Sequence, residues 1–203
     1  MKKIIAVVLL AAGTTTAFAQ SDDRRKGFIG ISIGPSIPVG DFGKENKDVP
    51  GLKTGAGAHL NLVNFGYRFS DRIGIAGKWF GGSNTLQVDG KVLEDIDPWS
   101  YGGMMAGPMV AIPLSEKIEL DFRPMIGYSI TQYPKYKDEP TLNSDASLAY
   151  SLGANIQFNI ASRFGIHAML DYFHTKAQYK NIKGYEQKIS TITPAVGLVY
   201  RFN

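Results

Sequence analysis

The sequence predicts an all-β fold in which eight antiparallel strands run up and down and close into a barrel. Three observations support this fold class. From residue 27 onward, apolar and polar residues alternate with a period of two, as in strands with one apolar face. The connections between these runs are alternately short and long. The number of runs is even, so both ends of the barrel chain are expected on the side of the short connections.

The eight alternating runs can be assigned in chain order. In 55–69 the apolar face is expected to change near Val63, and in 99–113 near Gly107 and Pro108, each through a bulge. Pro124 and Pro194 each remove a ladder donor, which argues against regular strand structure at those two positions. The predicted strands are 27–38, 55–69, 73–87, 99–113, 118–130, 148–160, 164–172 and 191–202.

The connections form two classes. Tight turns of similar polar chemistry are predicted at 70–72, 115–117 and 161–163. Longer polar loops are predicted at about 39–54, 88–98, 133–146 and 174–188. This asymmetry is typical of outer-membrane barrels, which have short periplasmic turns and longer extracellular loops.

Period-two alternation does not show which face points inward, so a secreted, lipocalin-like binder with an apolar interior remains an alternative. Glycine on the polar face favours the transmembrane arrangement, because the lumen of an eight-stranded barrel is barely wide enough for its side chains. Such glycines occur in most of the runs: Gly30, Gly34, Gly74, Gly127, Gly153, Gly165 and Gly197.

Aromatic residues on the apolar face stand at matching heights and predict two interfacial girdles. The distance between the two levels, at about 3.3 Å per residue in tilted strands, matches the apolar band of an outer membrane. The loop-side girdle is Trp79, Tyr128, Tyr150 and Tyr172, and the turn-side girdle includes Phe158, Phe164, Tyr200 and Phe202.

The N-terminal segment is predicted to be a secretory signal peptide, residues 1–19. Lys2 and Lys3 precede the apolar segment 4–12, and Ala17 and Ala19 form an A-x-A cleavage site, with cleavage after Ala19. The apolar segment is too short to span a bilayer. Residues 20–26 would then be a short tail and 27–203 the barrel.

Composition excludes several classes of site and partner. The chain has no cysteine, which rules out disulfides, a thiol nucleophile and Cys-ligated metals. The formal charge of +4 is scattered, so nucleic acid is not an expected partner. His174 lies near the predicted outer rim, but Lys176 stands where a serine partner would be sought. No catalytic residue, cofactor or metal is therefore predicted.

The polar face, assigned to the lumen, carries four cations and three anions that nearly cancel. Buried charges must pair or find hydrogen bonds. One interpretation is a structural plug held by ion pairs, with Arg123 and Asp171 paired directly or through a neighbour such as Asp121 or Lys78; the alternative is a charged gate or ion path. The predicted lumen network is Arg68, Lys78, Glu119, Asp121, Arg123, His167, Asp171 and Arg201.

Two segments carry a resemblance to known proteins: residues 34–42, GPSIPVGDF, and the final strand, which ends in Tyr200-Arg201-Phe202 before Asn203. Over 27–203 the chain resembles the outer membrane protein beta-barrel domain family, which includes PorT-like proteins, and the small OmpA/OmpX/OmpW-type barrels. The resemblance implies a porin-like, integral protein of the Gram-negative outer membrane. Its role would be non-enzymatic and structural or interaction-based, with a narrow pore or small-molecule transporter as the alternative.

The same resemblance implies partners. These are outer-membrane lipid and lipopolysaccharide, the barrel-assembly machinery through the C-terminal strand, and a protein partner at the extracellular loops. Loop 88–98 has four acidic residues and one lysine, whereas 174–188 has four lysines and one glutamate. The basic loop is expected to meet lipopolysaccharide phosphates or an acidic partner, unless it is ordinary surface charge.

Overall fold

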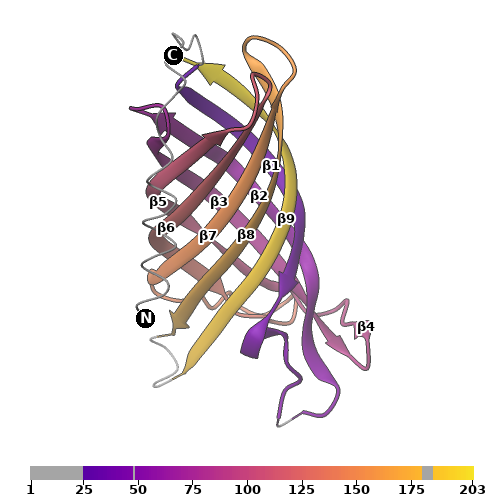
Figure 1. Cartoon of the computed structure of the whole chain (residues 1–203). Helices are drawn as coiled ribbons and strands as arrows, with labels where there is room; N and C mark the ends of the chain where they lie inside the picture. The colour runs from indigo at the N-terminus through magenta and orange to yellow at the C-terminus, as the bar shows by residue number, and fades with distance from the viewer. Residues whose placement is uncertain (1–24, 48, 180–184) are drawn as a thin grey trace, which may run out of the picture.

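The computed structural model describes residues 25–47, 49–179 and 185–203 (Figure 1). The predicted signal peptide and residues 20–24 lie outside the described part of the chain. A short 3₁₀ helix, η1 (Gly40–Gly43), follows the first strand. The strands are β1 (Gly27–Pro38), β2 (Leu52–Arg68), β3 (Ile73–Val88), β4 (Lys91–Val92), β5 (Trp99–Pro113), β6 (Ile118–Gln132), β7 (Ser147–Asn159), β8 (Phe164–Gln178) and β9 (Glu186–Phe202).

Eight of these strands form a closed antiparallel ring. β1 pairs with β2 on one side and with β9 on the other, and β2 also pairs with β3, so the sheet closes on itself. β4 is a two-residue extension paired with β3 beyond the barrel. Gly27 lies opposite Phe202, which places the start and end of the barrel together on the side of the short turns. The predicted fold class is confirmed.

The strands reach further on the loop side than the sequence indicates. β8 continues to Gln178 and β9 begins at Glu186, so most of the predicted loop 174–188 is strand. Lys176 and Lys188 lie opposite each other in this extension. The prediction of a long basic loop was wrong, because lysine and glutamine in an exposed hairpin give no alternating apolar signal.

The three tight turns share one backbone pattern. In each, two consecutive amides donate to the carbonyl oxygen of the first residue of the following strand: Ile73, Ile118 or Phe164. Ser70 and Ser115 add a side-chain oxygen that accepts the amide of Ile73 or Ile118. The common chemistry seen in the sequence therefore produces a common turn.

Prolines inside strands face other prolines. The register of β5 and β6 on both sides of a break places Pro108 opposite Pro124, and that of β1 and β9 places Pro35 opposite Pro194. The prediction that Pro124 and Pro194 disrupt regular strand structure is confirmed on one side of each strand, where the pairing is interrupted, but β6 and β9 continue through both prolines and pair without a break on the other side. The missing donors of both partners fall at the same point of the ladder, so the loss is confined to one site in each strand pair.

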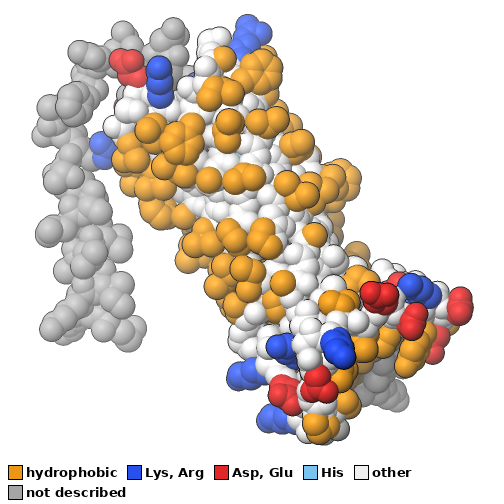
Figure 2. Space-filling model, turned by 90° about the vertical axis from the view of Figure 1, so that its right-hand side faces the viewer, with side chains coloured by type: hydrophobic (Ala, Val, Ile, Leu, Met, Phe, Trp, Pro, Cys, Tyr) orange, Lys and Arg blue, Asp and Glu red, His pale blue; other side chains and the backbone are white. Residues whose placement is uncertain are grey.

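The faces divide as the transmembrane interpretation requires. Large apolar side chains are exposed along the outer wall, while serine, asparagine, threonine and charged side chains are buried inside. Figure 2 shows the apolar belt around the wall and charged side chains gathered at the ends. Among the described residues, no helix is long and apolar enough to cross a membrane.

One of the two expected face changes occurs. In β2, Asn61 lies opposite Phe80 and Val63 opposite Trp79, which leaves Leu62 as the extra residue of a bulge. The change near Val63 is therefore confirmed. In β5 the pairing with β3 is unbroken, and Met105 and Met109 point inward on the same face. The expected change near Gly107 was wrong, because the lumen face of β5 itself carries apolar residues, which blur the alternation without any bulge.

Glycine lets large lumen side chains approach the wall. A Cβ at Gly66 would overlap the ring of Phe28, and one at Gly82 would overlap the ring of Tyr101. Both rings lie inside the barrel, where they are almost fully buried. The crowding that the sequence suggested for a narrow lumen is thus present at these positions.

We expect the folded protein in detergent to resist SDS until it is boiled. A closed ring leaves no free backbone edge, so opening it requires many hydrogen bonds to break together. Unboiled and boiled samples should migrate differently in SDS gels. Identical migration of the two samples would remove the support for a closed barrel.

Candidate functional site

The lumen contains three ion pairs near the turn side. Arg68 on β2 lies 3.0 Å from Glu119 on β6. Arg123 forms a two-pronged contact with Asp121, and Lys78 on β3 reaches Asp171 on β8. Because β3 and β8 lie opposite each other in the ring, the Lys78–Asp171 pair spans the lumen. All six side chains are at least nine-tenths buried, so each charge depends on its partner.

Arg123 and Asp171 do not pair directly: Arg123 pairs with Asp121 and Asp171 with Lys78, the two neighbours that the sequence indicated as possible intermediaries. Asp121 precedes Arg123 by two residues on the same strand face, and this spacing puts the carboxylate beside the guanidinium. Arg123 also donates to Asn64 at 2.6 Å and lies 4.9 Å from the centre of the Phe28 ring. The strand spacing therefore favours the local partner over the distant one.

The other two members of the predicted network are also inside. His167 is fully buried on β8, opposite Gly197 of β9. Arg201 is buried near the turn end of β9, where its backbone amide donates to the carbonyl oxygen of Arg163 at 2.7 Å. The eight predicted residues thus share one lumen face, and three ion pairs join six of them.

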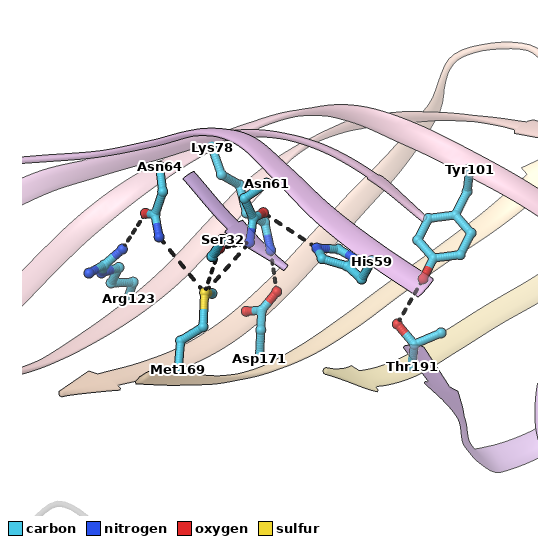
Figure 3. Close-up of polar contacts among 10 residues, drawn as sticks. All are labelled: Ser32, His59, Asn61, Asn64, Lys78, Tyr101, Arg123, Met169, Asp171 and Thr191. Carbon is cyan, nitrogen blue, oxygen red and sulfur yellow. Dashed lines mark hydrogen bonds and ion pairs between the residues drawn. The ribbon is translucent and has the colours of Figure 1, made fainter. Parts of the chain in front are cut away.

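A methionine occupies the centre of the polar region (Figure 3). The sulfur of Met169 lies 3.4 Å from the Ser32 hydroxyl, 3.5 Å from the Asn61 amide and 3.8 Å from the Asn64 amide. These three donors come from β1 and β2, so the thioether of β8 is held across the lumen. The flexible side chain fills a space between rigid polar groups.

Toward the loops, the lumen is filled by stacked rings that we call the aromatic plug: His59, Phe80, Tyr101 and Phe173. Tyr101 and Phe173 stack with centroids 5.2 Å apart, and Phe80 packs edge-on at 5.1 Å from Phe173. His59 stacks on Phe80 at 5.8 Å. The Tyr101 hydroxyl lies 2.7 Å from that of Ser36 and donates to Thr191. Rings from four strands therefore close the barrel at this level.

A second group of rings, the mouth cluster, covers the plug: Phe42, Trp99, Tyr133, Tyr179 and Tyr185. The short helix η1 places Phe42 in the interior, 5.9 Å from Trp99. Trp99 in turn packs edge-on against Tyr133 at 4.9 Å. Sequence reasoning missed both groups, because it assigned aromatic residues to the outer wall. The signal that could have found them is the alternation of faces along a strand. Phe80 directly follows the outward-facing Trp79, and Phe173 directly follows the outward-facing Tyr172, so both should face inward.

A pocket of about 450 Å³ lies between the mouth cluster and the loops. Its wall combines rings with three acids and three lysines, of which Lys44 donates to Asp41 at 2.8 Å. The adjacent lysine lowers the pKa of Asp41, and the carboxylate raises that of Lys44. Lys135 lies 3.2 Å from Asp97 at the same rim.

Comparison with known proteins places this geometry in a family. Residues 5–202 match the family described as outer membrane protein beta-barrel domain. The chain belongs to this family. A search of curated proteins finds no match.

Solved structures show the same fold. The Yersinia pestis attachment invasion locus protein Ail is 21% identical, with 87% of this chain and 99% of that chain covered and a TM-score of 0.50. Neisserial surface protein A is 8% identical, with 87% and 96% covered and a TM-score of 0.59. OprG from Pseudomonas aeruginosa is 14% identical, with 89% and 97% covered and a TM-score of 0.50.

Membership in this barrel family means that the outer wall faces lipid and that the protein resides in the outer membrane. The eight residues proposed as girdles all point outward. On the turn side Phe164 packs against Tyr200, and Phe202 stacks near Phe65 and Tyr67. On the loop side Tyr150 lies 6.5 Å from Tyr172, while Trp79 and Tyr128 are exposed.

The outer wall also holds a contact that sequence reasoning missed. His174 lies opposite Ser190 of β9, and its Nδ1 is 2.7 Å from the serine hydroxyl. From the sequence, a serine partner was expected only on the strand that carries His174, and Lys176 occupies that position. Within the described residues no group of three acidic or histidine side chains is arranged to hold a metal.

Charges at the loop end are largely paired. Lys176 lies 2.5 Å from Glu186, and Lys188 lies 3.6 Å from Asp41. Lys180 and Lys183, which contribute half of the predicted basic cluster, lie outside the described residues. The placed lysines are therefore matched by nearby carboxylates, as the ordinary surface-charge interpretation expects.

Proposed function

We propose that this outer-membrane barrel is a non-enzymatic, non-conducting scaffold whose recognition function lies at its extracellular mouth. The observation that carries the proposal is the aromatic plug, in which Tyr101 and Phe173 stack across a lumen already crossed by the Lys78–Asp171 pair. Phe80 and Phe173 are almost completely buried. A lumen filled with packed rings leaves no continuous water path, because interiors of this density exclude solvent.

The position of the polar loops supports an interaction role. The strands rise above the membrane band as hairpins, and the mouth cluster anchors η1 and the loop after β6 to the barrel. A binding surface held on a rigid wall loses little entropy when it engages a partner. The structurally similar Ail is named an attachment invasion locus protein, and a surface role in attachment is part of the proposal for this chain.

Three further partners belong to this proposal. Lipid contacts the exposed apolar wall, and lipopolysaccharide phosphates meet the lysines of the β8–β9 hairpin, such as Lys176 and Lys188. The barrel-assembly machinery recognises the C-terminal strand β9, which ends in Tyr200 and Phe202. The girdle residues fix the height of the barrel in the bilayer.

We expect the wild-type protein to show no steady conductance in planar bilayers. The double variant Tyr101→Ala/Phe173→Ala, which removes the stacked pair from the plug, should produce measurable leakage of small ions. The matched control Tyr150→Ala/Tyr172→Ala removes two rings of the outer wall and should remain silent. SDS-gel shifts would verify that each variant is folded.

A steady wild-type conductance would contradict the plug and favour the narrow-pore alternative. If the double variant fails to fold, Phe173→Leu, which keeps an apolar side chain but removes the stack, provides the second comparison with wild type. The conductance of these variants does not depend on whether a ligand binds at the mouth of the barrel.

A further inference from the structure

The mouth pocket is a closed-end site above the plug. It is lined by η1 and the residues after it, the start of β2, the end of β3, the segment leading into β5, the loop after β6 and the residues entering β9. Trp99 and Phe42 separate it from the lumen, since both are buried under the loops and pack on each other. A volume of about 450 Å³ falls in the range of small-molecule sites. The pocket therefore has the form of a binding site and not of a channel entrance.

The aromatic rings of the pocket are held in fixed orientations. Tyr133 packs edge-on against Trp99 at 4.9 Å and against Tyr185 at 5.7 Å. An edge-on ring leaves a face available for another partner. Tyr136, which also lines the pocket, is 59% exposed. The pocket thus presents prearranged apolar faces to a ligand.

The charges of the pocket cancel. Asp41, Glu45 and Glu139 are matched by Lys44, Lys53 and Lys135. Two of the lysines are already paired, Lys44 with Asp41 and Lys135 with Asp97. A phosphate or a carboxylate ligand would meet as much repulsion as attraction in such a site. The balance favours an uncharged ligand.

The remaining polar groups favour a ligand with many hydroxyls. Among the described residues, the side chains of Lys53 and Glu139 line the pocket without a hydrogen-bond or ion-pair partner. A lysine donates and a carboxylate accepts, so together they match a hydroxyl that does both. Burial raises the pKa of Tyr185 to about 12, so its phenol remains protonated. Lys53 and Glu139 are both exposed at the rim, so a hydroxylated ligand can hydrogen-bond to them in place of water, which a purely apolar ligand cannot do.

We propose that the mouth pocket binds a neutral sugar residue of an oligosaccharide. A pyranose ring has an apolar C–H face, which packs on an aromatic face such as that of Tyr136. Its rim of hydroxyls hydrogen-bonds to Lys53 and Glu139. This inference rests on the proposed function in one respect: the mouth of the barrel must face outward and be available to ligand.

The test uses the full mature protein in detergent micelles and isothermal titration calorimetry. The probes are the neutral trisaccharides maltotriose, cellotriose, mannotriose and N,N′,N″-triacetylchitotriose, with indole and inorganic phosphate as apolar and anionic probes. At least one trisaccharide should bind more tightly than either indole or phosphate. Tyr136→Ala and Glu139→Ala should each weaken that binding at least tenfold.

Two controls separate the pocket from the rest of the barrel. Tyr128→Ala, which removes an exposed ring from the outer wall, should leave sugar binding unchanged. Absence of binding by all four trisaccharides, tighter binding of indole or phosphate, or binding that survives both pocket variants would overturn the inference. Conductance is measured separately, so a silent barrel without sugar binding refutes only the pocket, and a conducting barrel that binds sugar refutes only the plug.

Discussion

Replacing Asp171 with alanine is expected to lower the free energy of unfolding by about 3–5 kcal/mol, the usual cost of stranding one charge of a buried pair. The side chain of Asp171 is 1% exposed, and the side chain of Lys78 is 2% exposed. Removal of the carboxylate leaves an ammonium group in the lumen next to Phe80, over whose ring it lies. Urea unfolding of the barrel in lipid vesicles, followed by tryptophan fluorescence, measures the change.

Two comparisons identify the cause of that loss. The double variant Asp171→Ala/Lys78→Met should cost less than the sum of its single variants, because methionine removes the stranded charge and keeps most of the apolar volume. Asp41→Ala breaks the exposed pair with Lys44 and should change stability very little. Additive single variants would show that the two charges do not depend on each other.

Leu152→Arg is expected to destabilise the barrel by about 2–4 kcal/mol, the cost of an arginine facing lipid near the middle of the membrane. Leu152 is 60% exposed and lies near the middle of β7, opposite Pro124 and Tyr172 on its neighbouring strands. No carboxylate lies beside it on the lipid side to pair with the guanidinium: its two cross-strand neighbours there are a proline and a tyrosine. The same urea titration in vesicles measures this effect.

Leu148→Arg is the matched control. Leu148 is on the same face of the same strand and is 70% exposed, but it is next to the loop end, where an arginine reaches headgroups. Its cost should be about 0–1 kcal/mol. Equal losses for the two variants would mean that β7 does not cross an apolar band.

Much of the fold follows from local patterns. The runs 27–38 and 99–113 coincide with β1 and β5, and the turn residues after β2, β5 and β7 were identified by their composition. The bulge near Val63 was also visible, because Leu60 and Leu62 alternate out of phase with Phe65 and Tyr67. Side chains along a strand point to alternate faces with a period of two residues, so each of these features depends only on residues that are close together in the chain.

In the lumen, the alternation of faces along each strand is not enough to predict the contacts. The polar residues of the lumen could be found by the face on which they lie, but the sequence left open whether Arg123 meets Asp171 directly or through Asp121 or Lys78. The choice between these partners depends on side-chain length and on the stagger of the strands as well as on the face. Apolar lumen residues such as Met109 and Phe173 were assigned to the wall or not assigned at all. A residue's type alone does not distinguish a ring facing lipid from a ring packed inside a narrow barrel.

The sequence by itself determined that eight strands alternate, that their outer face is apolar, and that turns and loops lie at opposite ends. Only the tertiary structure decided which residues meet across the lumen: Lys78 with Asp171, Met169 with the amides of β2, and Tyr101 with Phe173. The same holds for the mouth pocket, which brings together six separate segments. The physical reason is that the sheet closes into a ring. Pairing of β1 with β9 sets the stagger of the strands around the ring, and this stagger, which determines which side chains face each other across the lumen, is a property of all the strands together.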